Sequence, residues 1–392
     1  MGKTVVILGA GAGGRTAAEG LRATLSPADR IVLIDRSFTG SLGLSSLRVL
    51  AGRRTPEQVT TTLTPTALPG VSLVVGEVTG VDIDAQRVQY RQDGTDTGIG
   101  YDAALVALGA GLDTTVVPGL QAAIAAGIAD QFYTPDGAAA LRRRVATIEA
   151  GRIVVLIPAL PFKCPPAPYE AAFLIAEQLG EKVTDGTVRV DVITAEPYPI
   201  PVVDPAVGQE LVDMLEARGI GFRAGKTTAA INGDDRTVAF TDGSSESFDL
   251  LAVVPPHTSP VAALLPGAVN PGGWLPVDPT TLATALPGVW AIGDSTVLPL
   301  ANGKPLPKAG VFAEAAAAVA ADQIARYLGS AAPDTRFTGD GGCYLVVGGG
   351  QAARVGGHFL ATPAPQVTLR APTPEFHAEK EEQEREWLAR WG

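Results

Sequence analysis

The fold of this chain is decided by residues 4–35, which read TVVILGAGAGGRTAAEGLRATLSPADRIVLID. The first five residues are apolar and mostly β-branched, which is typical of a short buried strand. A glycine-rich turn follows, and Arg15–Leu25 has the pattern of a helix. A second apolar strand covers Ile31–Ile34 and ends at Asp35. The order strand, helix, strand predicts a βαβ unit with two parallel strands.

The glycine turn has the spacing Gly9-x-Gly11-x-x-Gly14, and Asp35 stands about twenty residues further on. This arrangement is typical of a Rossmann unit that binds a dinucleotide. The glycines let the backbone approach a pyrophosphate, the helix N-terminus supplies amide donors, and the acid can accept from a ribose hydroxyl. A tight turn that binds nothing is the alternative, but the surrounding strand, helix and acid favour the nucleotide site.

Composition limits the classes of function. A chain of 392 residues predicts two or three domains, and 46% hydrophobic with 18% charged residues indicates a compact protein with a large core. The net charge of −11 argues against nucleic acid as a partner and leaves room for a basic protein. Two cysteines make no disulfide scaffold, so any role they have is chemical.

A second βαβ unit follows, in which strands Arg152–Pro158 and Val188–Thr194 flank the helical stretch Tyr169–Leu179. Its turn has no glycines, because Pro158–Pro168 is rich in proline and contains Cys164. Proline has no backbone N–H, so this loop cannot wrap a pyrophosphate as a glycine turn does. The second nucleotide site is therefore expected to have been converted to another use.

Two later segments resemble signatures of the FAD-binding half of flavoproteins with two dinucleotide domains. Tyr101–Ala110 is a strand that closes on a small turn at Gly109, and Gly288–Asp294 is a strand that ends in Gly293-Asp294. The resemblance implies that Asp294 binds the ribityl chain of FAD. The alternative is that Asp294 caps the segment that follows it.

We therefore expect an α/β protein with two Rossmann-like βαβ domains, one FAD-binding and one degenerate NAD-binding, plus a C-terminal interface segment. Helices are expected over Ala309–Arg326 and Pro374–Trp391. The expected domains are 1–118 with 277–332 for FAD, 119–276 for the degenerate pyridine-nucleotide-like domain with Cys164, and 333–392 for the segment with Cys343 and the final helix.

The loop Phe162–Glu170 resembles the cysteine loop of sulfide:quinone oxidoreductases and of the flavoprotein subunit of flavocytochrome c sulfide dehydrogenase. Val277–Asp294 and Gly303–Gly310 are also similar to that family, and Cys343 is placed like the second active-site cysteine of the flavocytochrome subunit. That subunit binds its flavin through a cysteine that residues 38–46 lack here, so FAD is expected to be non-covalent. The chain has no haem-attachment motif.

The resemblance implies oxidation of sulfide, or of a related low-molecular-weight sulfur compound, through a Cys164–Cys343 redox disulfide. A disulfide is an electrophile that hydrosulfide can attack, giving a persulfide and a thiolate. Lys163 and the following helix N-terminus favour a thiolate at Cys164, and Glu170 could shuttle protons. The alternatives are small buried hydrophobes for the cysteines and a carboxylate that favours the helix dipole for Glu170.

Lys308 precedes the helix expected at Ala309 and could stabilise a reduced flavin, although an ordinary solvated lysine is the alternative. No metal is assigned, because His257, His358 and His377 share no motif. The residues expected to hold FAD are Gly9, Gly11, Gly14, Asp35, Arg36, Val78, Gly109, Gly293, Asp294 and Lys308.

Electrons are expected to leave the flavin for a quinone or a cytochrome c. An NAD(P)H-dependent flavin or quinone reductase is the alternative enzyme, which the missing second glycine turn disfavours, and a flavoprotein acting only as a binding subunit is the non-enzymatic one. No apolar run is long enough to span a bilayer, so at most peripheral membrane association is expected. No leader precedes the first strand, which predicts the cytoplasm, possibly at the membrane face, or the periplasm if a leader has been removed.

Overall fold

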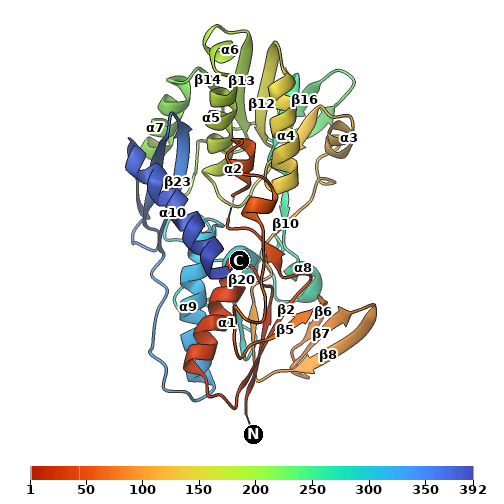
Figure 1. Cartoon of the computed structure of the whole chain (residues 1–392), viewed down its shortest axis with the longest axis vertical. Coiled ribbons are helices and arrows are strands. Elements are labelled where there is room, and N and C mark those ends of the chain that lie inside the picture. The colour runs from red at the N-terminus through yellow and green to blue at the C-terminus, as the bar shows by residue number, and fades with distance from the viewer. Residues whose placement is uncertain (1, 44, 392) are drawn as a thin grey trace.

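The computed structural model describes residues 2–43 and 45–391, and Met1, Leu44 and Gly392 lie outside them. Its first layer is a five-stranded parallel sheet in the order β21-β9-β1-β2-β5. The strands are β1 (Thr4–Leu8), β2 (Arg30–Asp35), β5 (Ser72–Val75), β9 (Ala103–Val106) and β21 (Val289–Ala291). Helices α1 (Ala12–Thr24) and α9 (Gly310–Tyr327) lie side by side against it (Figure 1).

A second parallel sheet of five strands has the order β11-β18-β12-β13-β14. Its strands are β11 (Ala129–Gln131), β12 (Gly151–Ile157), β13 (Val188–Thr194), β14 (Ile220–Arg223) and β18 (Leu250–Val253). Helices α4 (Pro135–Thr147) and α5 (Ala167–Leu179) pack on it. The expected α/β fold with two Rossmann-like units is confirmed, and the domain boundaries stay a prediction.

The C-terminal segment forms an antiparallel sheet and a helix. The elements are β23 (Asp340–Gly348), β24 (Gln351–His358), β25 (Gln366–Thr373) and α10 (Pro374–Trp391). Strand β25 was not expected from the sequence. Strand β23 packs against α5, and α10 runs from beside β23 toward α1 (Figure 1). The segment therefore covers elements of both halves.

Smaller elements complete the chain. Two antiparallel meanders are β6 (Glu77–Asp82), β7 (Arg87–Gln92), β8 (Thr95–Gly100) and β15 (Thr228–Asn232), β16 (Thr237–Phe240), β17 (Ser245–Ser247). The short strands are β3 (Thr39–Gly40), β4 (Thr61–Thr62), β10 (Gly111–Leu112), β19 (His257–Thr258), β20 (Leu275–Pro276) and β22 (Thr296–Val297). The short helices are α2 (Ser46–Leu50), η1 (Glu57–Val59), α3 (Leu120–Ala125), α6 (Glu181–Thr184), α7 (Pro205–Glu216), α8 (Val261–Leu264) and η2 (Gly293–Ser295).

Helix α1 begins at Ala12, three residues before the expected start at Arg15, so Gly13 and Gly14 lie inside it. The helix packs so closely on the turn that a Cβ at Gly14 would lie 1.9 Å from the carbonyl oxygen of Gly9. Only glycine fits there, and this close approach outweighs the low helix propensity of glycine. The expected start was wrong because propensity alone places the helix after the glycines.

Candidate active site

The glycine turn opens onto a cavity of about 210 Å³, here called the glycine-turn cavity. Gly9 has a φ of +97° at the sharp bend after β1. A Cβ at Gly11 would meet no atom within 4 Å, and Gly11 lines the cavity. The three glycines therefore have different roles. Gly9 allows the sharp bend, Gly14 lets the helix pack closely on the turn, and Gly11 leaves room for a ligand.

Asp35 is tied to the backbone of this turn. Its Oδ2 accepts from the Ala10 N–H at 2.8 Å, and its Oδ1 accepts from the N–H groups of Ser37 and Phe38 at 3.0 and 3.1 Å. The carboxylate thus fixes the shape of the turn, and its contact with a ribose stays a prediction.

Two further predicted FAD residues lie outside the lining of the glycine-turn cavity. Arg36 is exposed after β2, and Val78 is half-buried on β6, where it pairs with Tyr90. Their contacts with FAD also stay predictions.

Sequence reasoning missed Arg15, which is 1% exposed on α1. Its guanidinium donates to the carbonyl oxygens of Ala10 at 2.7 Å and Phe38 at 2.8 Å. Burial lowers the pKa of Arg15, and Asp35 opposes that effect. Arg15 therefore holds the glycine turn in shape through hydrogen bonds to its backbone. In the sequence, the only indication of this role is its position directly after Gly14.

The far end of the glycine-turn cavity is lined by Gly109, Gly293, Asp294 and Lys308, together with the cysteine loop. Asp294 is half-buried in η2, and its Oδ1 is buried with no hydrogen-bond partner among the described residues. Burial raises the pKa of Asp294, while Lys163 and Lys308 lower it. A buried carboxylate oxygen that lacks a donor suits a ligand hydroxyl. The capping alternative for η2 is wrong, because its N-cap is Ile292.

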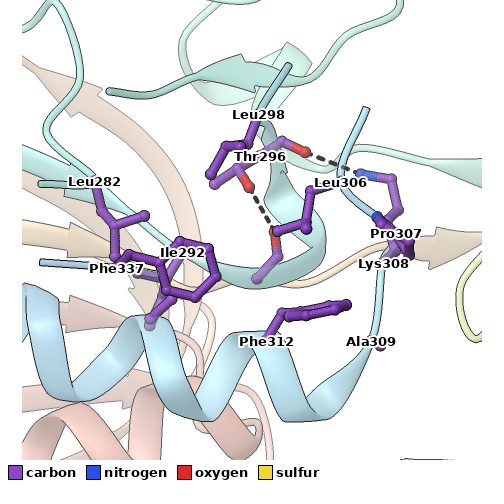
Figure 2. Close-up of a pocket in the computed structure, with 12 residues that line it drawn as sticks. Leu282, Ile292, Thr296, Leu298, Leu306, Pro307, Lys308, Ala309, Phe312 and Phe337 are labelled. Atoms are coloured by element: carbon purple, nitrogen blue, oxygen red, sulfur yellow. Dashed lines mark hydrogen bonds between the residues drawn. The ribbon is translucent and has the colours of Figure 1, made fainter. Parts of the chain in front are cut away.

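Lys308 is not a solvated lysine, since it is only 8% exposed. Its Nζ donates to the carbonyl oxygens of Asp294 at 2.7 Å and Thr296 at 3.0 Å, as Figure 2 shows for the latter. The ammonium also lies 3.5 Å from the centre of the Trp274 ring. Burial lowers the pKa of Lys308 to about 8. A positive charge is therefore fixed beside the start of α9, at the edge of the glycine-turn cavity.

Cys164, Cys343 and Glu170 line a second cavity of about 120 Å³, here called the cysteine cavity. It adjoins the first, because Cys164, Ala309 and Gly310 line both. Cys164 has the unusual φ of +55°, and Cys343 lies on β23. The sequence-predicted catalytic residues are thus brought together beside the predicted FAD site.

The two cysteines line the same cavity as close neighbours, and neither is in a disulfide. Interaction with the Cys343 thiol, with burial, raises the pKa of Cys164. The same interaction lowers the pKa of Cys343, helped by the Lys380 ammonium. The expectation that Lys163 and the helix N-terminus favour a thiolate at Cys164 was therefore wrong, because the neighbouring Cys343 thiol and burial raise the pKa of Cys164. The charge of Lys163 acts on Asp294 and His257 instead.

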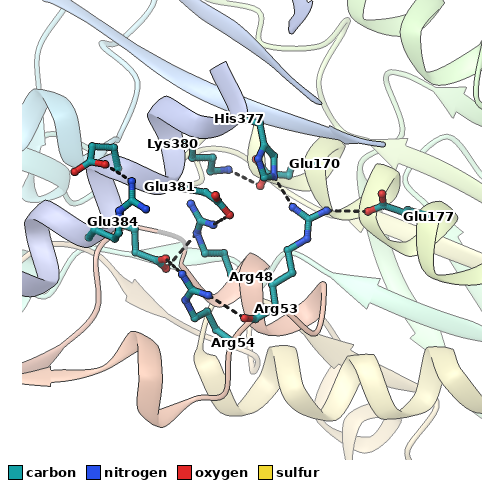
Figure 3. A network of polar contacts seen from close by, with 11 residues as sticks. Arg48, Arg53, Arg54, Glu170, Glu177, His377, Lys380, Glu381 and Glu384 are labelled. Carbon is teal, nitrogen blue, oxygen red and sulfur yellow. Dashed lines mark hydrogen bonds and ion pairs between the residues drawn. The ribbon is translucent and has the colours of Figure 1, made fainter. Parts of the chain in front are cut away.

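Glu170 is 3% exposed and forms an ion pair with Lys380 of α10, as Figure 3 shows. The Lys380 Nζ also donates to the carbonyl oxygen of Tyr344 at 3.3 Å. The alternative, in which Glu170 is only a carboxylate that favours the helix dipole, does not account for its ion pair with Lys380. Sequence reasoning missed Lys380 because it belongs to a charge-rich helix that reads as solvated.

A third cavity of about 500 Å³ lies behind the cysteine loop and is here called the proline cavity. Its walls are largely apolar and include Leu160, Phe162, Val202, Trp274, several prolines and Lys308.

Glu196, two residues past β13, also lines the proline cavity, near the position where an NAD-binding unit carries its ribose acid. Here it is 1% exposed and accepts from Tyr169 Oη at 2.5 Å, Thr194 Oγ1 at 3.0 Å and Ile200 N at 3.1 Å. Its oxygens are thus engaged within the protein, which agrees with a degenerate NAD unit.

Across the described ranges, no helix combines the length and apolar character that crossing a membrane demands. Within the same ranges, no group of three or more His, Cys, Asp or Glu side chains is arranged to hold a metal ion.

Comparison with solved structures supports the architecture. The sulfide:quinone oxidoreductase of Aquifex aeolicus matches 98% of this chain and 90% of its own, with 21% identity and a TM-score of 0.81. The NAD-dependent persulfide reductase of A. fulgidus matches 90% of this chain and 64% of its own, with 18% identity and a TM-score of 0.65. The water-forming NADH oxidase of Lactobacillus brevis matches 91% of this chain and 75% of its own, with 17% identity and a TM-score of 0.64.

These identities establish likeness of fold, so the expected similarity to sulfide:quinone oxidoreductases is confirmed at that level. A family model described as "Pyridine nucleotide-disulphide oxidoreductase" matches residues 3–156 and 169–321. The two matched ranges contain the glycine turn, both parallel sheets and the segment that carries Lys308. This chain belongs to the pyridine nucleotide-disulphide oxidoreductase family.

Proposed function

We propose that the chain is an FAD-dependent enzyme that oxidises sulfide, or a related low-molecular-weight sulfur compound, through Cys164 and Cys343. The carrying observation is that two cysteines from distant parts of the chain line one cavity, which adjoins the glycine-turn cavity at Cys164. A pair of thiols beside a site with the features of a flavin pocket is suited to exchange two electrons with it.

The residues present fit FAD. Gly11 leaves open space at the N-terminus of α1, where a pyrophosphate is stabilised by backbone amides. The unpartnered Asp294 Oδ1 suits a sugar hydroxyl, and Lys308 with the start of α9 suits the negative charge of a reduced ring. Bound FAD would supply the two-electron acceptor that the side chains lack.

The thiol geometry supports an order of events. Hydrosulfide attacks the disulfide at Cys164, because the Lys380 ammonium beside Cys343 favours the departure of Cys343 as a thiolate. The products are a persulfide on Cys164 and a thiolate on Cys343. A second hydrosulfide attacks the outer sulfur, which releases a two-sulfur product and frees the Cys164 thiolate. The two thiolates would then close the disulfide again, and bound FAD would supply the acceptor for the two electrons released.

An acceptor must then reoxidise the flavin, and two features point to different ones. The proline cavity is apolar, reaches Lys308 and suits a quinone ring. The net charge of −11 suits a basic cytochrome c. We favour the quinone, because the cavity adjoins the predicted flavin site.

The test is anaerobic mixing of the FAD-loaded protein with sulfide, followed by absorption in the visible flavin band. We expect sulfide to bleach the band and NADH to leave it unchanged. Bleaching by NADH alone would instead support the NAD(P)H-dependent reductase. A protein that stays colourless with added FAD would support the binding-subunit alternative.

A further inference from the structure

The cysteine cavity contains one ammonium group, which comes from the C-terminal helix. Lys380 lies between two features of the site: its Nζ pairs with Glu170 of α5 and also donates to the carbonyl oxygen of Tyr344, the residue after Cys343. Its side chain is 20% exposed, so water screens its charge only partly. The ammonium is held by contacts from two directions, and both of its partners flank the cysteine pair.

We infer that Lys380 is a positioning residue, which stabilises negative charge on the Cys343 sulfur while Glu170 opposes it. The role in turnover rests on the proposed function, whereas the effect on thiol reactivity is independent of it. Lys380 touches no substrate in this proposal and acts through Cys343.

Other charges surround the pair, and of the cations that lower the pKa of Cys343, Lys380 has the larger effect. Arg354 of β24 also lowers the pKa of Cys343, but by less than Lys380. The guanidinium of Arg354 lies 5.9 Å from the centre of the Tyr344 ring. The titratable and charged groups around the pair are Cys164, Cys343, Tyr133, Glu170, Arg354 and Lys380, with Arg48, Glu314, Tyr344 and Glu384 on the remaining walls.

Arg48 and Glu384, which both line the cysteine cavity, form an ion pair that holds α10 in place. The Glu384 carboxylate is 2% exposed and lies 3.2 Å from both Arg48 Nε and Arg54 Nη2 (Figure 3). One turn further on, Trp387 is 6% exposed, and Trp391 is 1% exposed. Because these side chains are buried, α10 cannot shift without losing them, so Lys380 has a defined place.

The two opposed charges predict effects of opposite sign. Removing the Lys380 ammonium leaves Glu170 to repel a thiolate, so Cys343 becomes less reactive. Removing the Glu170 charge leaves Lys380 unopposed, so Cys343 becomes more reactive. A role of the ion pair in folding alone would not produce this inversion.

The experiment measures alkylation of the reduced, FAD-loaded protein by iodoacetamide across pH, without sulfide, and reads each cysteine by mass spectrometry. We expect Lys380→Met to slow alkylation of Cys343 at neutral pH about tenfold and to move its midpoint to higher pH, as one unit of pKa implies. Lys380→Arg should restore the rate, and Glu170→Gln should raise it. Arg385→Met is the matched control, because Arg385 lies on the same helix, is exposed and pairs with Glu382.

Equal alkylation profiles for Lys380→Met and wild type, or slower alkylation in Glu170→Gln, would overturn the inference. If Lys380→Met unfolds at too low a temperature to be assayed, the inference is tested by the alkylation rate of Cys343 in the other two variants. That rate should exceed the wild-type rate in Glu170→Gln and equal it in Lys380→Arg. Sulfide is absent from the assay, so a failure of the proposed function leaves these outcomes unchanged.

Discussion

The backbone N–H of Cys164 donates to the carbonyl oxygen of Lys308 at 2.6 Å. One residue belongs to the loop after β12 of the second sheet, and the other leads into α9, which packs against α1. This single bond therefore ties the thiol-bearing loop to the edge of the predicted flavin site. It explains how a cysteine from one half can be held at a fixed distance from the cofactor site of the other.

Loss of either cysteine is expected to stop sulfide oxidation. Cys343→Ser removes the leaving thiolate, so sulfide-driven bleaching of the flavin should slow about a thousandfold. FAD content should stay unchanged, because Cys343 does not line the glycine-turn cavity. Stopped-flow absorption measures the rate. Sulfide oxidation that persists in Cys343→Ser would leave Cys164 acting alone.

The oxidised protein is expected to contain a Cys164–Cys343 disulfide. The two thiols line one cavity as close neighbours, which favours closure of the bridge. Alkylation of the air-oxidised, unreduced protein should label neither cysteine, and prior reduction should expose both to label. Two labelled cysteines in the oxidised protein would contradict the pair.

Two alanine substitutions in the glycine turn are expected to separate folding from cofactor binding. A Cβ at Gly14 would collide with the Gly9 carbonyl, so Gly14→Ala should lower the free energy of unfolding of the FAD-free protein by more than about 2 kcal/mol. A Cβ at Gly11 meets only open space, so Gly11→Ala should leave that free energy unchanged. It should instead weaken FAD binding at least about tenfold, measured by fluorescence titration. Unchanged FAD affinity in Gly11→Ala would place the pyrophosphate elsewhere.

Glu196 is expected to make stability depend on pH. Its pKa is raised from the ordinary 4.5 to about 7 by burial, so the folded protein keeps a proton that the unfolded chain has lost. The resulting stabilisation is complete below about pH 4.5 and is lost as pH rises through about 7. Glu196→Gln is neutral throughout, so its free energy of unfolding relative to wild type should rise by about 2.5 kcal/mol between about pH 5 and about pH 8.

Urea unfolding at the two pH values measures that gain. Glu149→Gln is the control, because the Glu149 side chain is 85% exposed. A gain of the same size in Glu149→Gln, or none in Glu196→Gln, would show that Glu196 keeps an ordinary pKa.

Blocking the proline cavity is expected to slow electron transfer to a quinone. Val202→Phe fills the cavity and Leu160→Glu adds a charge at a lining residue that is 48% exposed, so reoxidation of the reduced flavin by a short-chain quinone should slow about tenfold. Reoxidation by ferricyanide should keep its rate. Val116→Glu, at a position 53% exposed outside the cavity lining, is the control. Wild-type rates with quinone in both variants would favour a cytochrome c.

The elements of the two βαβ units could be predicted because apolar periodicity and turn residues are local signals. Strand β13 has the expected bounds, Val188–Thr194, and α1 starts three residues early because a tertiary contact permits glycine inside a helix. The cysteine pair followed from a resemblance. The lowered pKa of Cys343 could not be predicted, because it depends on Cys164 and on Lys380, which only the folded chain brings near.

The position of Lys308 illustrates the same limit. The sequence predicts that Lys308 lies before α9, but it does not predict that Lys308 is buried against Trp274 and two backbone carbonyls. Charged residues are usually exposed, so a lysine in the sequence reads as solvated until its partners are known. Residues that work through distant partners are therefore the ones that sequence patterns miss.

Helix α10 follows both sheets along the chain, so it is synthesised after them. Earlier segments generally fold first during synthesis, which lets a growing chain assemble its two sheets before α10 arrives. Until then the cysteine cavity lacks the wall that carries Lys380 and Glu384. The thiol pair therefore acquires the charged surroundings described above only after α10 has been synthesised and has packed beside β23.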